Sequence, residues 1–430
     1  MEGSIGLLPI GNKAEACHCI PALWLPFKRS AAVAPATTSS MDCRNGSMLL
    51  CTCGFAERRV KSYDMKAPGI LIYGVAFALP ALGQHVADPH ASVVDVAARQ
   101  AALSSTTNPV VREAIKGLQS CVATPLVASP TGRMNIPHHY ISGSSGPTNP
   151  AEAEATRVYA QFEKRITAGM NQYLATGSHA ESACALAQLD AWAQARALLD
   201  YDRDESSQAW YQVEWTLSSA GITDSVLVND STLDPAPQKR VTAWLDAAAR
   251  KDISFEKPGD SNNNHHYWRA LAATAIGVIA LDEKLYRFGV QAYVDAIAEI
   301  DPSGAFPKEL ARHENATHYQ GFALQPLVMI AEFVTRQGID LYAYKSHGRS
   351  LHDAIVFFGR AVDDPSLIRP YTTDPQSNSF GSGDFAEFAF YTARFGADGL
   401  PPAIVNALQH PTTATRVGGS TTVMAAYSNR

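Results

Sequence analysis

Apolar residues recur every three to four positions along most of the chain from about residue 150 onward. This is the period of a helix with one buried face, and no segment alternates apolar and polar residues long enough to predict a strand. The pattern predicts helices over residues 151–176, 180–200, 207–220, 238–250, 266–281, 284–299, 317–337 and 350–362. The sequence therefore predicts an all-α protein.

Short connections rich in helix-breaking residues separate the predicted helices. Such residues end or cap helices, and they gather at Gly177-Ser178, Gly221, 257–260, 301–304 and Gly338. Short connections make neighbouring helices antiparallel, which allows a bundle, a solenoid or a closed α/α toroid of helix hairpins. No repeat of the tetratricopeptide or ankyrin kind is visible, so the bundle and the toroid remain.

Two segments fall outside the helical pattern. Residues 130–150 are rich in His, Gly, Ser and Pro, and residues 364–383 contain three prolines with several Ser, Asn and Gly. Long polar loops in a helical protein are typically lids or binding loops. We therefore interpret both segments in this way.

A secretory signal peptide is predicted over residues 65–83. Met65 and Lys66 precede an apolar run over residues 70–79, which is followed by small residues before Gln84. A basic start, a short apolar run and small residues at the cleavage site are typical of such peptides. A buried helix is the alternative, and the run is too short to span a bilayer. We expect export to the periplasm, with Met65 as the start.

Residues 1–64 carry five of the seven cysteines and sustain no helical or strand period. We interpret this segment as a disordered upstream extension that is not part of the native protein. Cys17 and Cys19, and Cys51 and Cys53, are each separated by one residue. Zinc sites usually place two to four residues between paired cysteines, so no metal site is predicted here.

Residues 84–430 are predicted to form a single domain that contains only two cysteines, Cys121 and Cys184. An even pair in an exported chain predicts a disulfide. Closing a loop of this length would stabilise the fold by about 4 kcal/mol. Two separate buried thiols are the alternative, because free cysteine often behaves as a small apolar residue.

The composition narrows the class of partner. Apolar residues make up 46% of the 430 residues, charged residues make up 18%, and the net charge is −6. This is typical of a soluble enzyme. A negative chain has no general basic field for nucleic acid or an anionic membrane, so neither is expected as a partner. Any polyanionic ligand must be met by a local positive site.

The most unusual polar segment is Asn262–Trp268, which contains three asparagines and two histidines. Amides and imidazoles supply many hydrogen-bonding groups, and histidine titrates near neutral pH. Trp268 falls about one helical turn after Asn264 and His265, so one face could present an amide, an imidazole and an aromatic plane to a sugar ring. The alternative is an asparagine-rich helix cap followed by surface histidines.

A second polar cluster, over residues 308–320, leads into another apolar helix. Arg312 and Tyr319 are two helical turns apart and would share a side if the whole segment is helical. A guanidinium near a phenol lowers the pKa of the tyrosine, so that it can exchange protons near neutral pH. The alternative is a charged surface face with a half-buried tyrosine.

Together the two clusters resemble the mannuronate-type alginate lyases of the periplasm, and the resemblance spans roughly residues 120–365. It rests on Asn263-Asn264-His265-x-Tyr267-Trp268, on Glu309-x-x-Arg312 with Tyr319, on Phe322-Ala323-Leu324-x-Pro326-Leu327 and on Leu189-Asp190-Ala191-Trp192-Ala193. The family implies an incomplete α/α toroid with a substrate groove across one mouth. It also implies cleavage of a 1,4-linked polyuronate by β-elimination, without metal or other cofactor.

The resemblance also implies roles for single residues. Asn264 and His265, assisted by Arg312, would neutralise the carboxylate beside the C5 proton. Tyr319 would remove this proton from β-D-mannuronate and return it to the leaving oxygen on the same ring face. On the C5 epimer, His265 would be the base and Tyr319 the acid. The remaining implied substrate-binding residues are Asn263, His139, Tyr140 and Trp268. Trp268 would support the site from below, and packing alone is the alternative role for it.

Three departures from the family pattern surround this core. The lid segment, Tyr140–Ser145 here, lacks the lysine that mannuronate-cleaving members carry, and His313 and Gln320 replace a glycine and a histidine. The reaction type is therefore predicted more firmly than the polymer. Glucuronan or a glucuronate-containing exopolysaccharide is the alternative substrate.

Two other classes of function stay open. The first is a non-catalytic uronate-binding or export accessory protein that keeps the groove without turnover. The second is a glycoside hydrolase, which needs two carboxylates that flank the bond. Glu309 and Glu314 are candidates for that pair, although nothing in the sequence joins them. In each case we expect a monomer whose partner is an anionic polysaccharide.

Overall fold

The computed structural model describes residues 85–143, 145–257, 262–377 and 379–426. Contacts separate the chain into Met1–Phe77 and Ala78–Arg430, and the description below concerns the second unit. The predictions of an upstream extension over residues 1–64 and of a signal peptide over residues 65–83 lie outside the described residues. None of the described helices is long and apolar enough to cross a membrane.

The described part of the chain is built almost wholly from helices, as predicted. The longer ones are α1 (Val96–Ser105), α2 (Pro109–Gly117), α3 (Pro150–Thr176), α4 (His179–Gln194), α5 (Ser207–Leu227), α6 (Pro235–Ser254), α7 (Asn264–Ala280), α8 (Glu283–Ala298), α10 (Ala316–Arg336), α11 (Leu351–Asp363) and α12 (Phe388–Phe395). The shorter ones are α9 (Pro307–Leu310), α13 (Pro402–Ala407), α14 (Thr421–Met424) and the 3-10 turns η1 (His313–Asn315), η2 (Leu341–Ala343), η3 (Pro365–Ile368), η4 (Ser382–Phe385) and η5 (Thr415–Val417).

One small antiparallel hairpin interrupts the helical pattern near the end of the described chain. Its strands, β1 (Thr413–Ala414) and β2 (Gly419–Ser420), pair Thr413 with Ser420. The hairpin carries η5 at its tip, and η5 contacts both α3 and α5. Two-residue strands are too short to show alternation in the sequence.

Local sequence explains why several helices begin and end where they do. Asn149 and Asp234 accept hydrogen bonds from the first turns of α3 and α6, and a proline follows each of them. Proline suits this position because its missing N–H would be unpaired anyway. Gly177 ends α3 in the left-handed conformation, with φ of 69°, which glycine adopts without strain.

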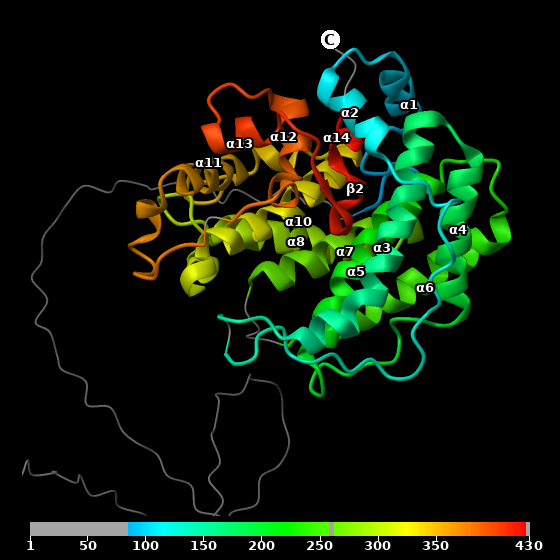
Figure 1. Cartoon of the computed structure of the whole chain (residues 1–430), viewed down its shortest axis with the longest axis horizontal. Helices are drawn as coiled ribbons and strands as arrows, with labels where there is room; N and C mark the ends of the chain where they lie inside the picture. The colour runs from blue at the N-terminus through cyan, green and yellow to red at the C-terminus, as the bar shows by residue number, and fades with distance from the viewer. Residues whose placement is uncertain (1–84, 144, 258–261, 378, 427–430) are drawn as a thin grey trace, which may run out of the picture. The chain divides into compact units, whose positions relative to one another are not determined.

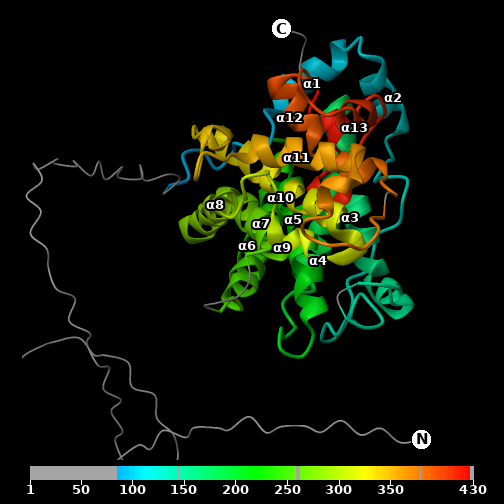
Figure 2. The same ribbon diagram turned by 90° about the vertical axis from the view of Figure 1, so that its left-hand side faces the viewer.

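Helix hairpins form an incomplete α/α toroid, which confirms the predicted fold class (Figure 1). Helices α5 and α7 lie near its middle, and α7 contacts α5, α6, α8 and α10. Figure 2 shows the same central position after a 90° turn. One buried apolar cluster involves α3 to α6 and a second involves α7, α8, α10 and α11, while Tyr211 and Phe288 pack against both.

Gly221 does not break a helix, contrary to the prediction. It lies inside α5, and a Cβ atom at this position would lie 2.9 Å from Ile276 Cγ1 of α7 and 3.2 Å from Ala275 Cβ. The glycine therefore permits close approach of two central helices rather than a turn. Helix α5 runs on through Gly221 to Leu227, beyond the end predicted at residue 220.

Cys121 and Cys184 form a disulfide, with their Cα atoms 6.0 Å apart. The bond joins the segment after α2 to α4. Arg165 of α3 donates from Nη1 to the Cys121 carbonyl oxygen over 2.6 Å. The long polar segment that leads to the predicted lid is therefore fixed to the helical body at its start.

Candidate active site

The first turn of α7 carries Asn263, Asn264 and His265. Asn263 is the helix cap, and its Oδ1 accepts a hydrogen bond from the His265 backbone N–H over 3.1 Å. Asn263 thus has the capping role that was the alternative interpretation, and its binding of substrate stays a prediction. This cap fixes the first turn of α7, and with it the directions in which the side chains of Asn264 and His265 point.

Asn264 is fully buried and held by Glu309 of α9. Its backbone N–H donates to Glu309 Oε1 over 2.6 Å, and Nδ2 donates to Oε2 over 2.8 Å. Burial raises the pKa of Glu309 to about 7, against the opposing effect of these hydrogen bonds. Asn264 Oδ1 is also buried and has no partner among the described residues. The side chain is thus clamped on one side, with its oxygen left unused.

His265 is held by two residues of α5. Its Nδ1 lies 2.6 Å from Glu214 Oε1, and its ring stacks on Tyr211 with the centroids 3.5 Å apart. The side chain remains 16% exposed. Burial lowers the pKa of His265 well below its usual value, and the nearby charges of Arg269, Arg312 and Arg416 lower it further. His265 is therefore neutral at pH 7.

Arg312 and Tyr319 meet as predicted, although not on a single helix. The chain turns between them through η1, where His313 adopts φ of 52°, and α10 begins only at Ala316. The Arg312 guanidinium carbon nevertheless lies 3.7 Å from the centre of the Tyr319 ring. The turn brings the guanidinium over the ring face.

The predicted fall in the pKa of Tyr319 is wrong in sign. Burial raises this pKa well above its usual value, and the charge of Arg312 opposes the rise without overcoming it. The hydrogen bond with Tyr140 adds to the rise. The sequence interpretation considered the guanidinium alone and could not foresee how completely the phenol is removed from water.

The loop over residues 138–149 lies against the same site, as predicted for a lid. Tyr140 OH is 2.9 Å from Tyr319 OH, and the Gly146 backbone N–H donates to Glu314 Oε1 over 2.9 Å. A β-bridge between Tyr140 and Thr148 closes the loop. His139 pairs with Glu152 at 3.3 Å and sets its ring edge-on to Tyr140. His139 therefore supports Tyr140, which reaches the site.

Trp268 does not line the site, which corrects its predicted role in sugar binding. It is completely buried, and its ring lies 5.1 Å from that of Phe322 in the apolar core. A residue one turn after His265 on the same helix points into the protein here, because both sides of α7 are covered by neighbouring helices. Trp268 supports the site through packing only.

Arg416 is a site residue that sequence reasoning missed. It lies in η5, and its guanidinium carbon sits 3.9 Å above the Trp215 ring. The Trp215 ring lies 5.8 Å from that of His265 and 6.2 Å from that of Phe322, which in turn lies 6.4 Å from Tyr319. The hairpin thus positions the positively charged guanidinium of Arg416 between the two predicted clusters. A single arginine in a non-periodic segment carries no local signal of this.

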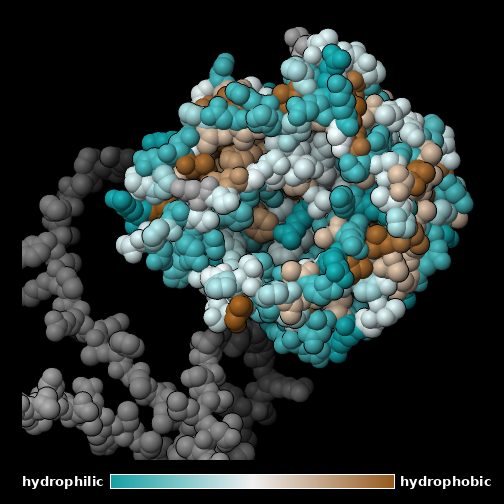
Figure 3. Space-filling view, in the orientation of Figure 1, coloured by the Kyte–Doolittle hydropathy of each residue, from teal (hydrophilic) through white to brown (hydrophobic). Residues whose placement is uncertain are grey.

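The four predicted catalytic residues are therefore gathered around one place, at the N-terminal ends of α7 and α10. Figure 3 shows a hollow near the middle of the face in view, bordered by both hydrophilic and hydrophobic residues. No group of His, Cys, Asp or Glu within the described ranges could hold a metal ion. Arg312 and Arg416 bring positive charge to a chain that is negative overall, which suits an anionic ligand.

The two carboxylates considered for a hydrolase have other partners. Glu309 holds Asn264, and Glu314 accepts the hydrogen bond from the lid. The structure thus gives each of them a supporting contact.

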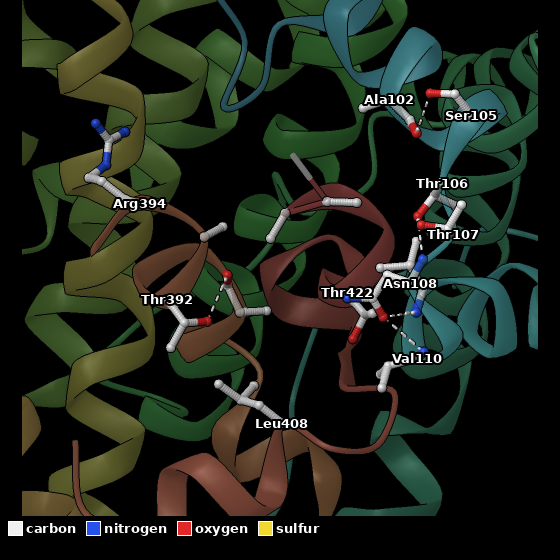
Figure 4. Close-up of a pocket in the computed structure, with 15 residues that line it drawn as sticks. Ala102, Ser105, Thr106, Thr107, Asn108, Val110, Thr392, Arg394, Leu408 and Thr422 are labelled. Atoms are coloured by element: carbon white, nitrogen blue, oxygen red, sulfur yellow. Dashed lines mark hydrogen bonds between the residues drawn. The ribbon is translucent and has the colours of Figure 1, made fainter. Parts of the chain in front are cut away.

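A separate pocket of about 840 Å³ lies between the α1–α2 hairpin and α12 to α14 (Figure 4). Small and neutral side chains form most of its wall, among them Ala102, Ser105, Asn108, Thr392 and Thr422. None of the candidate catalytic residues lines it. This pocket is distinct from the site described above.

Comparison with known proteins places the chain among polysaccharide-degrading enzymes. The family model described as alginate lyase matches residues 84–368. A polysaccharide lyase of Stenotrophomonas maltophilia is 30% identical over 276 residues, which cover 64% of this chain and 81% of that protein. An alginate lyase of Azotobacter vinelandii is 29% identical over 233 residues, covering 51% of this chain and 62% of the relative.

Solved structures agree with the sequence comparisons. Alginate lyase A1-III from Sphingomonas species A1 superposes with a TM-score of 0.74 and is 40% identical, covering 80% of this chain and 98% of that one. A variant of alginate lyase A1-III complexed with a tetrasaccharide gives a TM-score of 0.76 at the same identity and coverage. The chain therefore belongs to the alginate lyase family of polysaccharide lyases.

Proposed function

We propose that the protein cleaves a 1,4-linked polyuronate, with polymannuronate as its preferred substrate, by β-elimination that leaves a 4,5-unsaturated uronate end. One observation carries this proposal. The Arg312 guanidinium lies over the Tyr319 ring, and the charge of Arg312 also acts on the neutral imidazole of His265, which follows the clamped amide of Asn264. Membership of the alginate lyase family supports the same substrate class.

The first chemical requirement is to make the C5 proton acidic. That proton lies beside a carboxylate, and it becomes acidic only when donors neutralise the carboxylate and stabilise the charge that develops on it. Asn264 Nδ2 keeps a second N–H beyond the one given to Glu309, and Arg312 and Arg416 supply positive charge. These three residues are suited to hold the substrate carboxylate.

The second requirement is a group that moves the proton. On β-D-mannuronate the C5 hydrogen and the C4 leaving oxygen lie on the same ring face, so one residue can serve as base and then as acid. We infer that the Tyr319 hydroxyl performs both steps, and its contact with Tyr140 OH supports a route for its own proton. On the C5 epimer the proton lies on the opposite face, where His265 would be the base.

The direct test is to incubate residues 84–430 separately with polymannuronate, polyguluronate and glucuronan while following the ultraviolet absorbance of unsaturated uronate. We expect the fastest rise with polymannuronate, and we expect Tyr319→Phe to lower kcat by at least about 10²-fold, because general acid–base catalysis contributes 10²–10⁴-fold. Tyr342→Phe is a matched control, because Tyr342 is buried against Glu332, away from the site.

Cleavage products without a double bond would contradict the elimination. Saturable binding of uronates without any product would instead favour the non-catalytic uronate-binding role.

A glucuronate-containing polymer is the second candidate substrate, because the lid departs from the pattern of the mannuronate-cleaving members. No charged residue lies in the segment Tyr140–Gly146. The lid therefore offers no cation to a mannuronate carboxylate at this point. A faster rise with glucuronan than with polymannuronate would establish this alternative.

We also propose that the protein is exported to the periplasm and acts there as a monomer. The disulfide between Cys121 and Cys184 supports an oxidising compartment. Cell fractionation of the native producer with sequencing of the mature N-terminus checks the location, and cleavage before Gln84 is the expected result. Light scattering on the purified protein checks the oligomeric state.

A further inference from the structure

We propose that Glu214 is a positioning residue that fixes the tautomer of His265, so that the ring presents an unprotonated Nε2 to the groove and takes up a proton there when a uronate carboxylate binds. This inference rests on the proposed function, because it concerns how the same site meets its anionic substrate. It gives a role to a buried carboxylate that neither the sequence motifs nor the elimination chemistry requires.

The geometry fixes the imidazole ring on two sides. Glu214 is completely buried in α5, and its Oε1 lies 2.6 Å from His265 Nδ1. Tyr211, three residues earlier on α5, stacks against the ring at 18° between the planes. The ring therefore cannot exchange its two nitrogens without losing both contacts. No hydrogen bond from the described residues reaches Nε2, which is the nitrogen left for a ligand.

The contacts of Arg269 determine whether Glu214 or His265 carries the proton that lies between them. Its Nη1 donates to Glu214 Oε2 over 2.5 Å, and its Nε donates to Glu256 Oε1 over 2.9 Å. Arginine keeps its charge in proteins and can only donate. Burial raises the pKa of Glu214, and Arg269 opposes this rise by favouring the carboxylate.

A neutral Glu214 would leave the guanidinium of Arg269, which is 4% exposed, beside an uncharged acid. Arg269 would then keep Glu256 as its carboxylate partner, and removing the charge of one partner from this buried ion-pair network is costly. We therefore place the proton on Nδ1, as a donor to the Glu214 carboxylate. Nε2 then carries a lone pair, as in the histidine of a carboxylate–histidine pair.

The charged residues around His265 make the protonation of Nε2 depend on whether substrate is bound. Arg269 on its own helix, Arg312 before α10 and Arg416 in η5 all act on His265 with positive charge. They disfavour the imidazolium in the free protein. A bound uronate carboxylate neutralises these cations, and a proton from solvent can then add to Nε2. The resulting imidazolium lies between two carboxylates, those of Glu214 and of the substrate.

Nitrogen-15 NMR of the imidazole side chains tests the tautomer directly in the free protein. We expect the His265 spectrum at pH 7 to show a protonated Nδ1 and an unprotonated Nε2, with the signal assigned by its loss in His265→Gln. A protonated Nε2 in the wild-type protein would overturn the proposal. This readout needs no activity, so it separates failure of the tautomer from failure of the proposed elimination.

Glu214→Gln is expected to invert the tautomer. The introduced amide must direct its oxygen to Arg269, which can only donate, and its NH₂ group then faces His265 Nδ1. Nδ1 becomes the acceptor and Nε2 the donor. Glu256→Gln is the matched control, since Glu256 Oε1 alone accepts from both Arg269 and His266 and does not touch His265. It removes the same charge from the same network and should leave the tautomer of His265 unchanged.

The kinetic counterpart is the pH dependence of KM for the polymer that is cleaved. Proton uptake on binding should make KM of the wild-type protein rise by up to about tenfold per pH unit above neutral pH. Glu214→Gln should flatten this rise, because Nε2 then already carries a proton, whereas Glu256→Gln should retain it. An equal slope in all three proteins would overturn the coupling even if the tautomer is as proposed.

Discussion

Tyr319, which we propose as the base, holds its proton tightly in the free protein. Burial raises its pKa well above the usual value, and the stacked guanidinium of Arg312 only moderates the rise. Only the phenolate form of Tyr319 can remove the C5 proton. At pH values below the raised pKa of Tyr319, most of the protein carries the phenol form instead. The pH dependence of the chemical step therefore reveals which residue is the base.

We predict that kcat on polymannuronate rises with pH through the alkaline range, because a larger fraction of Tyr319 is ionised there. If polyguluronate is also cleaved with His265 as the base, its rising limb should lie at a higher pH than the lowered pKa of His265 in the free protein, since the bound carboxylate favours the imidazolium. Measuring kcat from pH 5 to pH 10 with both polymers checks this. A polymannuronate profile that is already flat at pH 6 would exclude Tyr319 as the base.

For single residues, the sequence predicted which side chains meet better than it predicted how deeply each side chain is buried. The pairing of Arg312 with Tyr319 followed from their spacing, even though a turn rather than one helix brings them together. The burial of Trp268 and the approach of Arg416 did not follow, because both depend on elements far away in the chain. Periodicity shows that a helix has a buried face, but it cannot show how many faces are covered.

Among the elements, the central contact between α5 and α7 depends on Gly221. We predict that Gly221→Ala lowers the free energy of unfolding by about 1–3 kcal/mol, because the methyl group must displace Ile276. The gain in helix propensity of about 1 kcal/mol would offset only part of this loss. Urea unfolding checks the prediction.

Gly117→Ala is the matched control for that substitution. Gly117 is the last residue of α2, and no atom lies within 4 Å of a Cβ placed there. We expect no loss of stability. If both variants lose the same free energy, close helix packing is not the cause.

The lid loop depends on its contact with Glu314. We predict that Glu314→Ala raises KM by a few fold to about tenfold, which corresponds to one lost hydrogen bond of about 0.5–1.5 kcal/mol. Glu314→Gln keeps an oxygen that can accept from the Gly146 N–H and should change KM less. Steady-state kinetics on the cleaved polymer compares them. An equal effect of the two variants would show that the charge, rather than the contact, matters.

The helices themselves were largely predictable, because apolar periodicity and caps act locally. The bounds of α3, α7, α8 and α10 lie within two residues of those predicted. The loops were recognised as loops, and the one over residues 138–149 lies where a lid was expected. Its individual contacts could not be predicted, because the lid forms hydrogen bonds with residues of α10 and of the turn before α10, which are distant in the sequence.

For the molecule as a whole, buried carboxyls set the pH at which the fold is most stable. Burial raises the pKa of Asp224, Asp252 and Glu309 to about 7. Each therefore binds its proton more tightly in the folded state than in the unfolded chain. The stability that each contributes is present below pH 4 and is lost as the pH rises through 7.

Asp230 acts in the opposite direction, because hydrogen bonds from His179, Ser182 and Thr232 lower its pKa to about 2. Its contribution is present above pH 4 and is lost as the pH falls towards 2. We therefore predict that the free energy of unfolding is larger near pH 5 than at pH 8, by on the order of 1 kcal/mol per raised carboxyl. Asp224→Asn should reduce this difference. An unfolding midpoint that rises steadily from pH 5 to pH 8 would contradict the prediction.

The position of Arg416 along the chain has a consequence for synthesis. Asn264, His265, Arg312 and Tyr319 all precede it, so a growing chain can fold the helices that hold these four before the hairpin of β1 and β2 has emerged. Such a nascent chain would hold Tyr319, the proposed base, without the cation at Trp215. Competence to bind a polyanion would thus arrive late in translation, after the rest of the groove has formed.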